Sequence, residues 1–294
     1  DRQRGSNTGM RPTFCRARRF GRLVLALACA APASAELDHP TPAGFLADAH
    51  DVFPSLVADP RELQFALRLA MPVQHTAKGE ISAGDYFGLY RWQLPWEDSY
   101  LQWSIGGNVT GRFDLVDETK DNEVDDFDAS MPIDVRVGRW STRILPYHVS
   151  SHLGDDYIKR TGILPQKYSF DSFKWFVAYE PLRALRLYAG YHFVIRNETT
   201  NLGHYALQGG VEWRSGWWGD QHAQTYWATD VQSWERVAWN PSVTSQLGVR
   251  LAHDSTQRQA VCPFVEFSSG HMTPGQFFNR EETRWVLGLR FELP

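Results

Sequence analysis

The chain has 294 residues, 43% of them hydrophobic and 22% charged, with a net charge of −4. This acidic balance argues against a nucleic-acid partner, which would select a basic face. Beyond the first 35 residues, no apolar run reaches the roughly 18 residues that identify a membrane-spanning helix, which excludes a helical membrane protein. Membrane-spanning strands escape that criterion, since only one face of each strand contacts lipid.

Residues 1–35 are predicted to be a secretory signal peptide with a few upstream residues. An arginine-rich region precedes the short apolar core 23–31, and Ala33-Ser34-Ala35 has the small-x-small form of a cleavage site. The mature chain would begin at Glu36, with a net charge of −10, because seven Arg and one Asp leave with the signal. A soluble N-terminal helix, or a lipoprotein attached through Cys29, is the alternative.

Residues 36–60 show no hydrophobic period and are interrupted by four prolines. We expect them to form a periplasmic lead-in to a folded domain over residues 61–294. From Leu63 onward, apolar and polar residues alternate in segments that recur about every 20 residues. The recurrence predicts one domain built from many strands.

The segment Leu101–Leu115 is the clearest of these. Its odd positions are apolar or glycine, and its even positions are polar apart from Gly106. Such alternation places one face of a strand in an apolar medium and the other in water. Ordinary strands have about 5–6 residues, whereas a strand that crosses a bilayer obliquely needs about 9–11. The length therefore favours a membrane-spanning strand.

Charged residues occupy the polar side of these segments throughout the chain. A barrel places that side in its lumen, where opposite charges can neighbour one another across strands, whereas a secreted sandwich, the alternative fold, would leave it in water. We predict an all-β fold, an antiparallel transmembrane β-barrel of about twelve strands, with ten as the other even number. The 12 Trp, 11 Tyr and 17 Phe suit aromatic girdles at two membrane interfaces. The charged positions are Arg68, Arg91, Arg112, Asp114, Asp134, Arg136, Arg186, Glu212, Asp230, Arg250 and Arg290.

The acidic stretch Asp117–Asp128 is predicted to be a long loop on the outer side of the membrane. We interpret it as a solvated run of charges, because it lacks the Asp-x-Asp-x-Asp-Gly spacing of an EF-hand loop. Binding of a divalent cation is the alternative.

The segment Leu145–Tyr157 is where the sequence suggests chemistry. In a strand, His148, Ser150 and His152 share one face at intervals of about 6.5–7 Å. A histidine close to a serine, oriented by a carboxylate or an amide, can activate the hydroxyl as a nucleophile. The His-x-Ser pattern resembles that of outer-membrane phospholipase A and of the lipid A deacylases, which are acyl hydrolases built on barrels.

This resemblance implies roles for individual residues. His148 would be the base and Ser150 the nucleophile. Asp155 or Asp156 would orient the histidine or bind calcium. The enzymes of these families hold the pair on the outer wall of the barrel, where lipid arrives.

The alternation of neighbouring residues predicts a different orientation for the pair. Ile133, Val135 and Val137 form one apolar face, and extending their parity along the chain places His148 and Ser150 on the lumen side, unless Pro146 resets the register. On this interpretation, which we favour, the segment is a cluster at the barrel rim that packs a loop onto the barrel through hydrogen bonds.

A wider resemblance covers most of the mature chain. Phe53–Arg61, Tyr147–Asp156, Gly275–Phe278 and the closing Leu287–Phe291 are similar to the domain of unknown function 1207 family. Members of that family are signal-bearing, predicted outer-membrane proteins without an established activity. The resemblance implies a location in the outer membrane of a Gram-negative envelope and leaves the function open.

Two functions follow from these patterns. We expect an outer-membrane barrel with a structural, ligand-binding or narrow-channel role, without a cofactor, and with outer-membrane lipids and the barrel assembly machinery as partners. The alternative is an acyl hydrolase of the phospholipase or lipid A deacylase type. It would use His148, Ser150 and Asp155, with calcium held by Asp155 and Asp156.

Overall fold

The structure is a computed structural model, and it describes residues 43–118, 120–198 and 203–293. The predicted signal peptide 1–35 and the first part of the predicted lead-in, 36–42, lie outside the described residues. Within the described part of the chain, no helix combines the length and the apolar character needed to cross a membrane.

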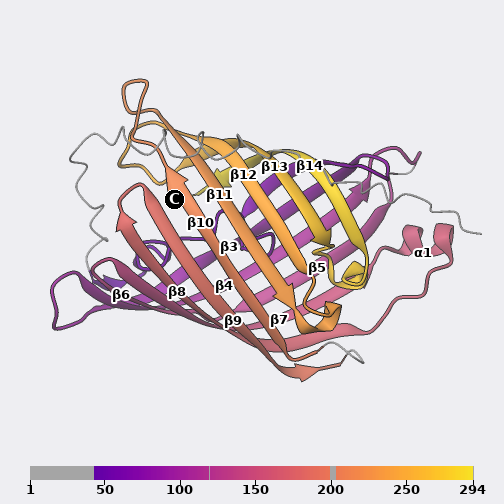
Figure 1. Ribbon diagram of the computed structural model, residues 1–294, viewed down its shortest axis with the longest axis horizontal. Helices are drawn as coiled ribbons and strands as arrows, with labels where there is room; N and C mark the ends of the chain where they lie inside the picture. Colours follow the sequence, from indigo (N-terminus) through magenta and orange to yellow (C-terminus); the bar gives the residue numbers. More distant parts are fainter. Residues whose placement is uncertain (1–42, 119, 199–202, 294) are drawn as a thin grey trace, which may run out of the picture. The chain divides into compact units, whose positions relative to one another are not determined.

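The strands close into an antiparallel barrel with twelve strand positions, which confirms the predicted fold class. The strands are β1 (Gly44–Phe45), β2 (Phe65–Pro72), β3 (Lys78–Gln93), β4 (Ser99–Asp114), β5 (Asn122–Ser130), β6 (Ile133–Val137), β7 (Trp140–Leu153), β8 (Tyr168–Leu182), β9 (Leu185–Asn197), β10 (Tyr205–Arg214), β11 (Ala223–Trp234), β12 (Pro241–Ala252), β13 (Ala260–His271) and β14 (Glu281–Glu292). β14 pairs with β2 to close the ring. β5 and β6 share one position, because β4 and β7 each pair with both. β1 has two residues, pairs with β3 and adds no position to the ring. Figure 1 shows the strands running obliquely round the barrel.

β4 has the alternation that its sequence predicts. Trp103 and Ile105 are exposed on the outer wall, while Gln102 and Ser104 are fully buried in the interior. Because side chains on a strand alternate between its two faces, this single strand defines an apolar outside and a polar inside.

β3 differs from the simple alternation of its sequence, which predicts one apolar face for Tyr86, Gly88, Tyr90 and Trp92. Tyr86 and Gly88 are buried in the interior, whereas Tyr90 and Trp92 are exposed on the outer wall. The register shifts between Gly88 and Tyr90. An extra residue at a β-bulge exchanges the two faces of a strand, which explains the difference.

The prediction of a loop over Asp117–Asp128 is wrong for most of its length. Residues 122–130 form β5, which pairs with β4 and with β7. Asp126 is buried and accepts a hydrogen bond from the Ser151 hydroxyl, while Phe127 is exposed on the outer wall. Since lumen-facing positions are polar, an acidic strand of this kind has the composition of a solvated loop.

The two ends of the barrel differ in their connections. At the end where β2 begins and β14 finishes, which we call the terminus end, 138–139 and 183–184 are two-residue turns between neighbouring strands of the ring. The opposite end, which we call the helix end, carries α1 (Asp155–Thr161), η1 (Glu235–Val237) and η2 (Gly275–Phe277). Figure 1 shows α1 at this end.

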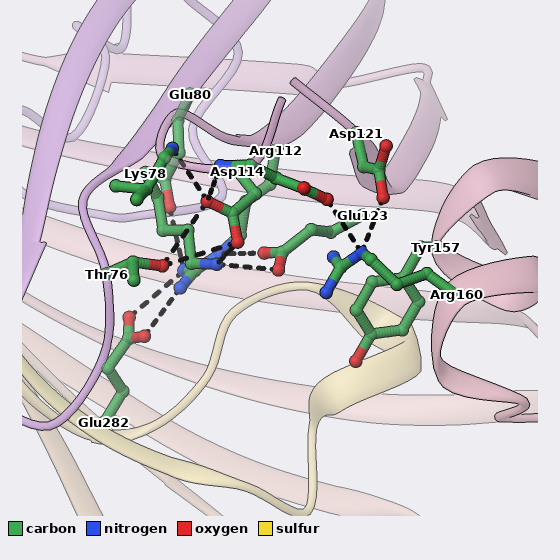
Figure 2. Close-up of polar contacts among 12 residues, drawn as sticks. Thr76, Lys78, Glu80, Arg112, Asp114, Asp121, Glu123, Tyr157, Arg160 and Glu282 are labelled. Carbon is green, nitrogen blue, oxygen red and sulfur yellow. Dashed lines mark hydrogen bonds and ion pairs between the residues drawn. The ribbon is translucent and has the colours of Figure 1, made fainter. Parts of the chain in front are cut away.

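Ion pairs fill the interior near the helix end (Figure 2). Lys78 Nζ lies 2.9 Å from Asp114 and 2.8 Å from Glu123. Arg112 contacts Glu123 at 3.2 Å and Glu282 at 2.6 Å. These buried charges neutralise one another across strands, as the polar side of the alternating segments predicts.

Residues 46–64, which we call the plug segment, occupy the interior of the barrel. The Arg143 guanidinium lies 4.6 Å from the ring centroid of Phe53 and donates a 2.9 Å hydrogen bond to the Phe53 carbonyl oxygen. The Val57 N–H donates a 2.8 Å hydrogen bond to Glu212 on β10. Two interior cavities measure only about 50 and 10 Å³.

The plug segment includes the second half of the predicted lead-in, 36–60. The sequence did not predict its burial, because the apolar residues of the segment follow no period. The periplasmic location of the lead-in stays a prediction.

Candidate active site

β7 presents two contrasting faces. Arg143 and Tyr147 are buried in the interior. On the alternate positions, His148 and His152 are exposed and Ser150 is partly exposed. The histidines and the serine therefore lie on the outer wall of the barrel, which is the lipid-facing side of a membrane barrel.

The predicted lumen orientation of His148 and Ser150 is wrong, and the reason is the turn before β7. Val137 pairs with Trp140 across the two-residue turn 138–139. Residues paired in this way share a face of the sheet. The outward positions therefore change from odd numbers in β6 to even numbers in β7, and one parity cannot be extended through the turn.

Asp171 on β8 is the partner of the histidine. The register places His148 opposite Asp171, and His148 Nδ1 lies 2.7 Å from Asp171 Oδ1. The two side chains are 49% and 45% exposed. A carboxylate on Nδ1 fixes the orientation of the ring and leaves Nε2 as the atom that can exchange a proton with a hydroxyl.

Ser150 stands beside this pair on the same face. Two residues along a strand separate its Cα from that of His148 by about 6.5–7 Å. Among the described residues, the side-chain hydrogen bond of His148 is to Asp171, and none joins it to Ser150. Catalytic hydrogen bonds are often long without substrate and shorten in the substrate complex, so the arrangement can become a Ser-His-Asp triad.

The surroundings of these polar groups are mixed: Asp125 lies opposite His152, and Arg196 lies opposite Asp171. Phe127 on β5 lies opposite Ser150, and it is exposed on the outer wall together with Trp175 and Ile195. Ser150 lies three residues before the end of β7, near the helix end. Polar groups on a lipid-facing wall are costly. Where they occur together in a bonded pair beside a nucleophile, they indicate a functional site.

The other predicted site residues lie elsewhere. Asp155 and Asp156 form the first turn of α1, beyond the end of β7. Asp156 is exposed and accepts a 3.1 Å hydrogen bond from Lys159. Among the described residues, no cluster of three or more His, Cys, Asp and Glu could hold a metal ion. Calcium binding by Asp155 and Asp156 stays a prediction.

Asp171 was not predicted as a site residue. It lies 23 residues after His148, and only the register of β7 with β8 brings the two together. One signal in the sequence points to it: it precedes Phe173 and Trp175 at the same parity, so it is a charged residue on an otherwise apolar face.

Comparison with known families identifies the chain. The family model described as "Protein of unknown function (DUF1207)" matches residues 28–292. The chain belongs to this family. The match spans the barrel and the plug segment, and it confirms the resemblance found in the sequence. No curated protein sequence matches the chain.

Solved structures with a similar fold are outer-membrane proteins. Outer membrane phospholipase A from Escherichia coli has a TM-score of 0.54 at 12% identity, over 78% of this chain and 92% of the phospholipase. The calcium-bound dimer of the outer membrane phospholipase of Salmonella typhi has a TM-score of 0.54 at 10% identity, over 83% and 94%. The KdgM porin has a TM-score of 0.41 at 10% identity, over 79% and 99%. At these identities the phospholipase likeness shows an outer-membrane-type barrel, and it does not show an activity.

Proposed function

We propose that this protein is an outer-membrane hydrolase of lipid esters, in which Ser150 is the nucleophile, His148 the general base and Asp171 the residue that orients the base. One observation carries the proposal: the hydrogen-bonded His148–Asp171 pair lies beside Ser150 on the outer wall. A lipid in the bilayer reaches that wall directly, whereas the interior is filled by the plug segment and by ion pairs.

The geometry supports an acyl-enzyme mechanism. Ser150 Oγ attacks the ester carbonyl carbon while its proton passes to His148 Nε2. The ester C–O bond then breaks, and His148 returns the proton to the departing alcohol. Water then attacks the acyl carbon while His148 Nε2 takes its proton. The bond from the acyl carbon to Ser150 Oγ breaks, His148 returns the proton to Oγ, and a fatty acid and free Ser150 result. Asp171 stabilises the imidazolium formed in each half of the reaction.

The position of Ser150 along the barrel supports a choice of leaflet. Longer loops of outer-membrane barrels are extracellular and short turns are periplasmic, so the helix end faces outward in our proposal. Ser150 lies near that end. The substrate is therefore an acyl ester of a lipid in the outer leaflet of the bacterial outer membrane.

Hydrolysis by the purified full chain in detergent tests the proposal. With phospholipid in mixed micelles, the wild type should release fatty acid, and Ser150→Ala should abolish the release. Ser151→Ala is the matched control, because Ser151 faces the interior and should leave the rate within a few-fold of wild type. A wild type without turnover on phospholipid, lipid A and simple acyl esters would refute the proposal.

A second candidate is a structural envelope barrel, favoured by the filled interior. In this role the plug segment keeps the barrel closed to ions, and the outer wall anchors it in lipid. Wild-type protein in planar bilayers should show no single-channel steps. Regular conductance steps would contradict a closed barrel and favour a narrow channel instead.

A further inference from the structure

Attack on an ester creates an oxyanion, and donors aimed at that oxygen are a large part of catalysis in such sites. In β7 the register pairs Ser150 with Phe127 on one side and with Ser169 on the other. Backbone N–H groups in a paired strand lie in the plane of the sheet and donate to the neighbouring strands. They do not point out from the wall toward a lipid. The donors that this wall itself can direct toward the oxyanion are therefore side chains.

Apart from the base His148, two side chains close to Ser150 can donate a hydrogen bond. Ser169 lies directly opposite on β8. His152 is the next outward residue of β7, and its ring packs edge-on against Phe127 with the centroids 5.9 Å apart. Phe127 lies opposite Ser150 and Asp125 lies opposite His152, so this ring contact is a diagonal one that links His152 to the neighbour of the nucleophile across the strand pair.

The two histidines flank Ser150 along β7, and each contacts a different neighbouring strand. His148 is drawn to Asp171 on β8, whereas His152 is drawn to Phe127 on β5. A base and an oxyanion donor need this separation, since the base binds the serine proton while the donor binds the carbonyl oxygen. Ser169 lies on the same side as the base and is less well placed.

We infer that His152 is a catalytic residue of the proposed hydrolase: its ring N–H donates to the oxyanion formed when Ser150 attacks the ester. This inference rests on the proposed function. The site thus carries a His-x-Ser-x-His arrangement in which the first histidine moves the proton and the second stabilises the charge. The apolar ring of Phe127 positions the second histidine.

The test compares kcat and KM of the full chain in detergent, on a chromogenic acyl ester and on phospholipid. His152→Phe keeps a ring against Phe127 but removes the donor, and His152→Gln keeps a donor. His152→Phe and His152→Ala should lower kcat by about 100-fold or more, the usual loss for one oxyanion donor, with little change in KM. His152→Gln should recover much of kcat, and Ser169→Ala should stay within a few-fold of wild type.

Several results would overturn the inference. A wild-type kcat in His152→Phe would exclude a donor role, and a loss in His152→Ala that His152→Phe does not share would indicate a packing role. A kcat in His152→Gln as low as that in His152→Phe would contradict a role as hydrogen-bond donor. A loss confined to Ser169→Ala would assign the donor to Ser169. If wild type hydrolyses esters in a Ser150-dependent way while the His152 variants match it, only this inference fails. If wild type hydrolyses nothing, the proposed function fails first.

Discussion

The inner and outer faces of β7 each carry a side-chain contact to a carboxylate, and the two contacts have almost equal length in opposite surroundings. Inside, Arg143 is 1% exposed and contacts Asp134 at 2.8 Å. Outside, His148 is 49% exposed and contacts Asp171 at 2.7 Å. Arg143 also packs on Phe53 of the plug segment, so its pair belongs to a filled interior. An exposed pair contributes little to stability. Burial, and not contact length, therefore separates a structural pair from a candidate catalytic one.

Removal of the outward base should give the largest effect on activity. His148→Ala should lower ester hydrolysis by about 10³-fold or more, because a Ser-His pair loses most of its catalysis with either member. The adjacent inward change, Tyr147→Phe, should leave the rate within a few-fold of wild type. Initial rates on a chromogenic acyl ester, with folding checked by gel mobility before and after heating, measure both. Equal rates for wild type and His148→Ala would contradict a catalytic role for the outer face of β7.

Removal of the inward cation should give the largest effect on stability. Arg143→Ala should lower the free energy of unfolding by about 3–5 kcal/mol, because Asp134 would be left buried without its partner. The double variant Arg143→Ala with Asp134→Ala should recover part of the loss. Urea titrations of the refolded protein in detergent measure these changes. A loss below about 1 kcal/mol for Arg143→Ala would contradict the structural role of the pair.

The orienting carboxylate should show the smallest effects. Asp171→Ala should lower hydrolysis about 10–100-fold less than His148→Ala does, because loss of the orienting carboxylate of a triad costs less than loss of the base. It should change the free energy of unfolding by at most about 1 kcal/mol. Asp171→Asn keeps an oxygen that can accept from His148 Nδ1, so it should retain more activity than Asp171→Ala. The same rate and urea measurements apply. A stability loss as large as that of Arg143→Ala would show that the outer pair is structural as well.

The barrel could be predicted from the sequence because side-chain alternation records which face meets lipid. The alternation of Leu101–Leu115 predicts β4 in this way. β5 could not be recognised, since Asp126 and Asp128 lie on its inward side and leave too few apolar residues to show a period. The plug segment was also missed, because a chain buried inside a polar lumen needs no regular pattern.

The candidate site was predicted in part. His148 and Ser150 were recognised by residue type and spacing, but their face depends on the two-residue turn 138–139, which reverses the parity. The contact of Asp171 with His148 depends on the register of β7 with β8. That register is set by pairing between the two strands, so the residues around His148 do not predict it. Local pattern therefore identified the proposed nucleophile and base, whereas the proposed orienting residue required the fold.

Covalent labelling of Ser150 tests whether His148 activates its hydroxyl on the outer wall of the folded barrel. A fluorophosphonate reacts with a serine hydroxyl only when a neighbouring base activates it. After incubation of the folded full chain, mass spectrometry of its peptides should show one adduct, on Ser150, and the adduct should disappear in His148→Ala. An unlabelled Ser150 in the folded wild type, or equal labelling in His148→Ala, would contradict an active site on the outer wall.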